Sequence, residues 1–323
     1  MNIEMIRAAA QRLDGEARCT PLLNSPFIDD LAGRRVWIKP ECLQHTGSFK
    51  FRGAWAALSA LEPSIRAKGV VAFSRGNHAQ GVALAAARHN VPSVIIMPAD
   101  APHLKIENTR SLGAEVVLYN RATEDREVIG LSLEHERGLT MIKPFDDPQV
   151  IAGQGTAGLE IAKQTSSLGV EKGDVLVCCG GGGLTSGIAL ALEADAPGLC
   201  VRPVEPEGFD DVTRSLFSGK IEKNIKTTGN ICDAIITPQP GNLTFPVMQR
   251  LCGSGLIVDE NEALESMAIA FLRLKLVEEP GGDVALAAAI FRKGEIEGND
   301  VVVVISGGNV DPDLFAKSLN TLV

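Results

Sequence analysis

The 323-residue sequence has no apolar run long enough to cross a lipid bilayer, and its first residues lack the layout of a secretory signal peptide. It also lacks Pro-rich linkers, low-complexity tracts and solenoid repeats, which argues against fibrous and largely disordered proteins. The seven cysteines are odd in number and show no Cys-x-x-Cys spacing, which favours a reducing compartment over a disulfide framework. We therefore expect a cytoplasmic protein of enzyme size.

The sequence has fewer basic than acidic residues, with 31 Lys and Arg, 40 Asp and Glu, and a formal net charge of -9. Nonspecific binding to nucleic acid needs an excess of basic side chains, so we expect no nucleic-acid partner. We expect no membrane partner either, because no stretch of the chain is suited to enter a bilayer. Small anionic ligands are not excluded, because backbone N–H groups at a helix N-terminus bind them locally.

What the sequence does contain is a regular alternation of short apolar runs and amphipathic helical stretches. This rhythm is typical of an α/β fold, in which helices cover both faces of parallel sheets. The length suits two lobes, and residues 143–148, with two prolines and two acids, interrupt the pattern between them. Strands are predicted at 69–73, 93–97, 115–119, 174–179, 200–204 and 300–305.

Lys50 is the one basic residue in the run Thr46-Gly47-Ser48-Phe49-Lys50-Phe51, at the start of a predicted helix. An amine among small and aromatic neighbours loses solvation, which favours its neutral, nucleophilic form near neutral pH. Such a lysine can hold an aldehyde cofactor as a Schiff base. The alternative is a lysine that extends from a helix face to solvent, which is the usual behaviour of a lone lysine.

Four consecutive glycines, at 180–183, follow an apolar strand and precede a helix expected to begin near Thr185. So many glycines cost conformational entropy, which indicates close approach of the backbone to a ligand. The N–H groups of the loop and the dipole of the following helix favour a phosphate monoester. A dinucleotide is the main rival, although the spacing is not Gly-x-Gly-x-x-Gly, and a tight turn without a ligand is the third interpretation.

Two further loops follow predicted strands. In residues 74–81, the Asn77 amide is suited to donate to a phenolic oxygen, and Ser74 with nearby N–H groups is suited to hold a carboxylate. We expect His78, in the same loop, to be a packing or capping group. In residues 306–309, the Ser306 hydroxyl is suited to bond a heteroaromatic nitrogen without protonating it.

Six segments, in this order, resemble the pyridoxal-phosphate enzymes of the threonine dehydratase and serine racemase family: KPECLQHTGSFKFRGA, SRGNHAQG, IAGQGT, GGGGL, VEPEG and ISGGNVD. The resemblance covers nearly the whole chain from Thr20 onward. It implies the two-lobed fold of the tryptophan-synthase-β type (fold type II), in which each lobe is a mostly parallel sheet flanked by helices. The implied large domain comprises residues 1–62 and 147–323, and the small domain residues 63–146. A homodimer with the cofactor between the lobes is also implied.

The resemblance gives a role to each of these loops. Lys50 would carry pyridoxal phosphate as a Schiff base and act as the base for the α-proton. Phe49 would pack on the cofactor ring, Asn77 would bond the ring hydroxyl, and Ser306 would face the pyridine nitrogen. The implied phosphate-binding residues are Gly180, Gly181, Gly182, Gly183 and Leu184. For the substrate, we expect contacts from Ser74, Arg75, Gly76 and His78.

A neutral serine at the pyridine nitrogen makes the ring a poorer electron sink, which favours β-elimination over transamination. Arg75 departs from the family, which usually has a second serine there. A guanidinium stays protonated, so Arg75 argues against racemisation, but it binds carboxylates through two hydrogen bonds unless it points to solvent. We therefore expect conversion of 3-hydroxyaspartate, a small amino-acid substrate, to oxaloacetate and ammonia. Threonine or serine dehydration, racemisation of serine or aspartate, and β-substituent exchange are the alternatives.

Acidic residues also follow the strand-like run that ends near residue 204. Clusters rich in oxygen suit Mg²⁺, Mn²⁺ or Ca²⁺, and the resemblance implies Glu205, Asp211 and the Phe209 carbonyl as ligands. A solvated acidic loop is the alternative. Glu279 is either an orienting group near the cofactor or a helix-terminal charge, and Asp283 stands where relatives usually have a small uncharged residue.

Overall fold

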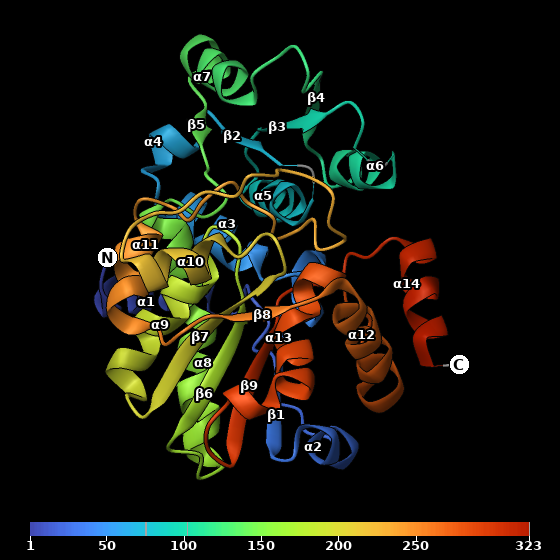
Figure 1. The fold of residues 1–323 in the computed structure, drawn as a ribbon. Coiled ribbons are helices and arrows are strands. Elements are labelled where there is room, and N and C mark those ends of the chain that lie inside the picture. Colours follow the sequence, from blue (N-terminus) through green and yellow to red (C-terminus); the bar gives the residue numbers. More distant parts are fainter. Residues whose placement is uncertain (75, 102, 323) are drawn as a thin grey trace.

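The computed structural model describes residues 1–74, 76–101 and 103–322, which contain two separate parallel sheets (Figure 1). The larger sheet has the order β1-β9-β6-β7-β8, and the smaller has the order β4-β3-β2-β5. Every pairing between these strands in the described ranges is parallel. The strands are β1 (Arg35–Pro40), β2 (Val70–Phe73), β3 (Ser93–Pro98), β4 (Glu115–Tyr119), β5 (Thr140–Met141), β6 (Gly173–Cys178), β7 (Leu199–Pro206), β8 (Leu256–Val258) and β9 (Asp300–Ile305).

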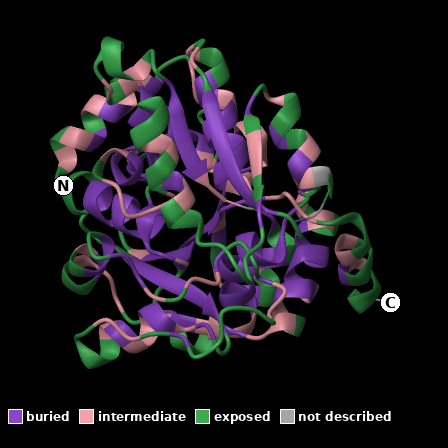
Figure 2. Cartoon of the chain, turned by 90° about the horizontal axis from the view of Figure 1, so that it is seen from above, coloured by how far each residue is buried: buried purple, intermediate pink, exposed green. Residues whose placement is uncertain are grey.

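Helices cover the sheets, and the central strands are buried on both faces, as expected for parallel sheets (Figure 2). Every residue of β3 and of β9 is buried. The α-helices are α1 (Ile3–Leu13), α2 (Pro26–Ala32), α3 (Lys50–Ala60), α4 (Pro63–Arg66), α5 (Asn77–Arg88), α6 (His103–Ser111), α7 (Arg126–Arg137), α8 (Pro148–Ser167), α9 (Gly183–Asp195), α10 (Asp211–Ser218), α11 (Thr244–Leu251), α12 (Glu260–Leu274), α13 (Pro280–Phe291) and α14 (Pro312–Leu319). Short 3₁₀ turns lie at Glu41–Leu43, His45–Gly47, Lys293–Glu295 and Asn320–Leu322.

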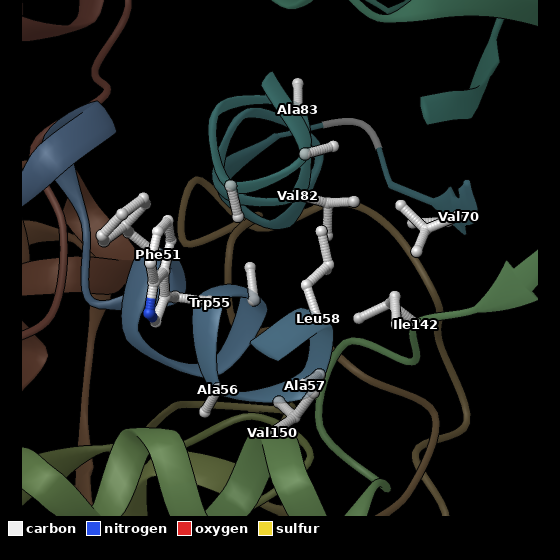
Figure 3. Packing of buried hydrophobic residues seen from close by; sticks show 14 of the residues in the cluster. Phe51, Trp55, Ala56, Ala57, Leu58, Val70, Val82, Ala83, Ile142 and Val150 are labelled. Atoms are coloured by element: carbon white, nitrogen blue, oxygen red, sulfur yellow. The ribbon is translucent and has the colours of Figure 1, made fainter. Parts of the chain in front are cut away.

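Helix α3 lies between the two lobes and packs on α5 of the small-sheet side and on α8 of the large-sheet side (Figure 3). Its apolar residues Phe51, Trp55 and Leu58 are buried in one cluster with Val82 of α5 and Val150 of α8. Because Lys50 is the first residue of this helix, its backbone is fixed at the junction between the lobes.

The carboxyl ends of three neighbouring strands of the large sheet meet at one edge. Pro40 of β1 pairs with Ile305 of β9, and Val304 of β9 pairs with Val177 of β6. The segments that leave this edge are the 3₁₀ turns before α3, the glycine loop before α9 and the loop that begins at Ser306. Open α/β sheets bind ligands at this edge, so the register brings three sequence-distant loops to one place.

Buried charged side chains beneath α3 form a network of ion pairs. Arg52, which is 1% exposed, donates from Nε to Glu41 Oε2 at 2.7 Å and from Nη1 to Glu160 Oε1 at 2.7 Å. Lys39, which has no exposed surface, donates to Glu160 Oε2 at 2.5 Å and to the Thr20 carbonyl at 2.7 Å. Glu41 also accepts from the Thr20 hydroxyl at 2.7 Å, so each charge in the network has partners.

The six predicted strands are confirmed, with ends shifted by two residues or fewer. Strands β1, β5 and β8 were not predicted, since β1 contains two basic residues and the other two are very short. The helix after the glycine loop begins at Gly183, two residues before the predicted start at Thr185. No helix in the described ranges is both long enough and apolar enough to span a membrane.

Candidate active site

A cavity of about 420 Å³ opens at the carboxyl edges of both sheets. Twelve of the residues predicted to bind cofactor or substrate line it together: Phe49, Lys50, Ser74, Gly76, Asn77, His78, Gly180, Gly181, Gly182, Gly183, Leu184 and Ser306. Arg75, the residue on which the substrate prediction depended, lies outside the described residues. The three predicted metal ligands are not part of the cavity wall as described.

The Lys50 amine projects into this cavity and donates to the Pro144 carbonyl at 2.8 Å. Its Nζ lies 5.0 Å from the centre of the Phe49 ring. Desolvation lowers the pKa of Lys50 to about 8, although the negative charge of Glu279 acts in the opposite direction. These contacts agree with the expectation of a desolvated amine more than with a lysine that extends to bulk solvent.

The glycine loop approaches its neighbours too closely for side chains. A Cβ on Gly181 would overlap the Phe145 ring, and Gly182 has a left-handed backbone with φ of 87°. Gly182 is also the N-cap of α9, and no side chain caps that helix. The first N–H groups of α9 are thus at the cavity wall without a capping side chain, which is a suitable place for a phosphate.

Asn77 is held by two side chains that the sequence did not link to it. Its Nδ2 donates to Glu279 Oε1 at 2.5 Å, and its Oδ1 accepts from Asn309 Nδ2 at 2.7 Å. Glu279 is 3% exposed, lines the cavity and is the N-cap residue of α13. Burial raises the pKa of Glu279, and the hydrogen bond from Asn77 opposes that shift. Glu279 is therefore an element of the cavity wall and the helix N-cap at the same time.

Ser306 lies at the same end of the cavity and is 5% exposed. Its backbone N–H donates to the Gly282 carbonyl at 2.9 Å, and its carbonyl accepts from the Phe49 N–H at 3.2 Å. These two bonds tie the loop after β9 to the first turn of α13 and to the residue before Lys50. The backbone of Ser306 is thus fixed at the cavity, where its hydroxyl is suited to meet a ring nitrogen.

His78 is buried and one of its ring nitrogens lies 2.9 Å from the Ile142 carbonyl. Desolvation, and then the charge of Lys50, lower the pKa of His78 to about 3. The imidazole is consequently neutral at physiological pH and bonded to the backbone. These contacts agree with the structural role predicted for it.

Three cationic side chains of the small-sheet side also line the cavity, none of them predicted as a site residue: Lys105, Arg121 and Arg126. Lys105 Nζ lies 3.9 Å from Asp233 Oδ2, and Arg121 Nη2 lies 2.7 Å from Asp100 Oδ1. The Arg126 guanidinium lies over the Phe73 ring, 4.7 Å from the ring centre. No local motif marks them, because they come from α6, the segment after β4 and the start of α7. Together they place positive charge on the wall of the cavity.

Glu205 and Asp211 lie close together at the end of β7 and the start of α10. Glu205 accepts from the N–H groups of Val212 and Thr213 at 2.9 and 2.7 Å, and Asp211 Oδ1 accepts from Asn224 at 2.5 Å. Burial, and then the charge of Asp211, raise the pKa of Glu205 to about 8, while burial raises that of Asp211 to about 7.

The fit of these two acids to a divalent cation is incomplete in the described part of the chain. Asp211 Oδ2 is buried and has no hydrogen-bond partner there. No cluster of at least three acidic, histidine or cysteine ligands occurs among the described residues. Two adjacent carboxyl groups with one orphan oxygen could still accept a hard cation if carbonyl or water oxygens complete its shell.

The cavity residues fit pyridoxal phosphate. The cavity combines a desolvated amine, a glycine loop at an uncapped helix start, an aromatic side chain beside the amine and a neutral hydroxyl. These groups match, in the same order, the aldehyde, the phosphate, the ring face and the pyridine nitrogen of that cofactor.

Comparisons with known proteins agree with this interpretation. The family model described as "Pyridoxal-phosphate dependent enzyme" matches residues 13–307. The chain is 45% identical to an L-threo-3-hydroxyaspartate ammonia-lyase of Pseudomonas sp, over 96% of each chain. It is 42% identical to the enzyme of that name from Saccharomyces cerevisiae, over 97% of this chain and 94% of the yeast protein.

Solved structures give the same result for the fold. The crystal structure of a threonine deaminase from T.th. superposes with a TM-score of 0.91 at 42% identity, over 96% of this chain and 99% of that one. The serine racemase from Dictyostelium discoideum superposes with a TM-score of 0.90 at 36% identity and the same coverage.

Proposed function

Since the chain belongs to the family of pyridoxal-phosphate dependent enzymes, we propose that it is an ammonia-lyase acting on a β-hydroxy amino acid. The proposed substrate is 3-hydroxyaspartate, and the products are oxaloacetate and ammonia. The relatives named for this reaction support the proposal, and so does the chemistry of the cavity.

Lys50, the glycine loop, Asn77 and Ser306 are the residues that would hold pyridoxal phosphate. When bound, the cofactor supplies an electron sink that acidifies the α-proton and permits loss of the β-hydroxyl. The Ser306 hydroxyl is neutral, so it accepts or donates a hydrogen bond without adding charge at the ring nitrogen. Phe49 lines the cavity beside the Lys50 amine, where its ring is suited to pack on the cofactor.

Lys50 is the proposed base for the α-proton of the substrate. The pKa of about 8 leaves a useful fraction of neutral amine near neutral pH, which a lysine with its ordinary pKa does not have. The Pro144 carbonyl accepts from Nζ and orients the amine in the cavity. Burial of Lys50 therefore serves both its attachment to the cofactor and its proton transfer.

The observation that carries the preference for 3-hydroxyaspartate is the positive wall formed by Lys105, Arg121 and Arg126. Threonine and serine have one carboxylate, whereas 3-hydroxyaspartate has two, and the second needs a cationic partner when it leaves water. Of these three, Arg126 has its guanidinium over the Phe73 ring, 4.7 Å from the ring centre, and forms no ion pair with an acidic side chain of the described residues. Arg75 remains a predicted further contact to that carboxylate.

Steady-state kinetics with L-threo-3-hydroxyaspartate, threonine and serine test the substrate. We expect the wild type to have its highest kcat/KM on hydroxyaspartate, and Arg126→Met and Arg75→Ala to lower that value by about 10- to 100-fold, as for loss of one charged hydrogen bond. Both variants should change kcat/KM for threonine much less. Arg110→Met, which removes an exposed guanidinium of α6 paired with Glu107, is the matched control.

A wild type that prefers threonine or serine would overturn the hydroxyaspartate assignment and favour a threonine or serine dehydratase. Formation of D-serine from L-serine at a comparable rate would instead favour a racemase. Chiral chromatography of the same reaction mixtures, beside the ammonia measurement, separates these outcomes.

We further propose that Glu205, Asp211 and the Phe209 carbonyl bind Mg²⁺, Mn²⁺ or Ca²⁺. The support is the buried, unpartnered Asp211 Oδ2 beside a second carboxyl group. A homodimer, a cytoplasmic location and the domain limits 1–62 with 147–323 and 63–146 also belong to this proposal. The support for a two-domain division is that β2 to β5 form a sheet of their own.

A further inference from the structure

Two fully buried carboxyl groups bracket the first turn of α13. Glu278 precedes the N-cap residue Glu279, and Asp283 is the fourth residue of the helix. Neither side chain has exposed surface. None of their four carboxyl oxygens finds a hydrogen-bond donor group on another described residue. The acids therefore face each other and apolar surroundings.

The positions of Glu278 and Asp283 are those at which many helices place two apolar side chains. A residue before the N-cap and the fourth helical residue commonly pack together and fix the angle at which the chain enters the helix. Here two carboxyl groups lie close enough to each other at these positions to form a hydrogen bond. Such a bond needs a proton, because two ionised carboxylates offer acceptors alone.

Among the described residues, no cation takes the place of this proton. The titratable side chains that act on the two acids are thiols on three other elements: Cys42 after β1, Cys178 of β6 and Cys232 in the loop after α10. Burial raises the pKa of each thiol, so all three are neutral. No cationic side chain is among the groups that shift the two acids within the described ranges.

The turn between the two acids borders the cavity, since its residue Glu279 lines the cavity wall. The Gly282 carbonyl accepts from the Ser306 N–H at 2.9 Å and from Cys178 Sγ at 3.1 Å. A Cβ on Gly282 would overlap the Gly307 carbonyl, so the turn and the loop after β9 are in direct contact. The Glu279 N–H donates to that same carbonyl at 3.1 Å. A change in the entry angle of α13 would displace both Glu279 and Ser306.

We propose that Glu278 and Asp283 share a proton, and that this carboxyl pair positions Glu279 and Ser306 at the ring end of the cofactor cavity. The positioning role rests on the proposed cofactor site, whereas the shared proton does not. The pair accounts for Asp283, the acid that departs from the family pattern. Its members are positioning residues, since they act through the turn that they enclose.

The pKa directions give the pH range in which the pair holds. Burial raises the pKa of Glu278 to about 7, and burial, then the charge of Glu278, raise that of Asp283 well above its ordinary value. A carboxyl group with a raised pKa contributes its full stability below its ordinary pKa and loses it as the pH rises through the folded value. The pair therefore releases its first proton near pH 7, and it should weaken when the remaining, shared proton is lost at the higher pKa of Asp283.

The test compares wild type with Asp283→Asn, in which an amide N–H replaces the shared proton at every pH. In the wild-type holoenzyme we expect the unfolding temperature to fall by about 2–4 °C more between pH 6.5 and pH 9 than in the variant. The absorbance and fluorescence of the bound cofactor should change over the same pH range in wild type and stay constant in Asp283→Asn. Glu265→Gln, an acid-to-amide change in α12, is the control and should behave as wild type.

The outcomes separate the two parts of the proposal. Equal pH dependence of unfolding in wild type and Asp283→Asn would overturn the shared proton. A difference in unfolding with identical cofactor spectra would overturn the positioning role while the proton remains. If Asp283→Asn does not fold, the double variant Glu278→Gln/Asp283→Asn, with two amides, replaces it in the same comparison. Failure to bind pyridoxal phosphate at any pH, even in wild type, would count against the proposed function and not against the pair.

Discussion

The ion-pair network beneath α3 and the wall of the cavity both take charged groups out of water, but the pKa values of these groups shift in opposite ways. Burial alone would raise the pKa of Glu41, yet the charge and hydrogen bonds of Arg52 hold it below its usual range. In the cavity wall, burial raises the pKa of Glu279 and lowers that of Lys50. The difference is the partner, because a buried charge keeps its ionised form when an opposite charge lies within hydrogen-bond distance.

This contrast assigns different tasks to the two regions. Removing one member of a fully paired network leaves a buried charge without a partner, which destabilises the fold. The network therefore contributes to stability. A desolvated and weakly paired group has a pKa close to neutrality, so its contribution is to proton transfer. Variants in the two regions should therefore separate stability from activity.

The largest expected effect is that of Lys50→Ala on activity. Loss of the proton transfer alone should lower kcat by about 10²- to 10⁴-fold, and the cofactor absorbance band of the attached amine should disappear. The unfolding free energy of the cofactor-free protein should change little, because the lowered pKa of Lys50 means that the folded state holds this amine at a cost. Lys163→Ala, an exposed lysine of α8, is the control for both measurements. Full activity in Lys50→Ala would contradict the proposed role.

The next largest effect is that of Arg52→Met on stability. The substitution leaves Glu41 buried without its cation, and breaking such a pair costs about 3–5 kcal/mol of unfolding free energy, measured by urea denaturation. Arg35→Met is the matched control, since Arg35 forms an ion pair with Asp300 but its side chain is 56% exposed. That control should lose at most about 1 kcal/mol. Equal losses in both variants would remove the distinction between the buried network and a surface pair.

The smallest expected effect concerns Glu205 and Asp211. Burial raises the pKa of both acids, as it does for Glu279 in the cavity wall, whereas Arg52 lowers the pKa of Glu41 in the network. If a divalent cation binds there, chelator should lower the unfolding temperature, and Mg²⁺ at about 100 times its dissociation constant should restore roughly 2.7 kcal/mol. Glu205→Gln should abolish the response to Mg²⁺, while Glu207→Gln, an exposed acid two residues away, should retain it. Indifference of the wild type to chelator would contradict the metal site.

Much of the fold was predictable because hydrophobic periodicity is local. Strands β4 and β9 lie at the predicted residues 115–119 and 300–305, and both are short apolar runs between helical stretches. Strand β1 was missed because Arg35 and Lys39 interrupt its apolar pattern. Lys39 is nevertheless buried, since Glu160, more than a hundred residues later, compensates its charge.

The candidate site was predictable for a related reason: its loops each carry a local signal. Lys50 among aromatic and small residues, the run of four glycines and the Ser-Gly-Gly after a buried strand are all visible in short windows. The cationic wall was missed, because Lys105, Arg121 and Arg126 come from separate segments without a motif. Arg75, which the sequence marked, lies outside the described residues, so its role stays a prediction.

The sequence by itself determined the strand and helix pattern, the three cavity loops and the kind of chemistry their residues can perform. These follow from backbone preference and side-chain type, which act over a few neighbouring residues. The tertiary structure alone decided which buried charges are paired. Arg52 meets Glu41 and Glu160, Asn77 meets Glu279, and Glu278 meets Asp283 through the geometry of the fold. A pKa depends on the distance to a partner and on the loss of water, and neither is set until the chain has folded.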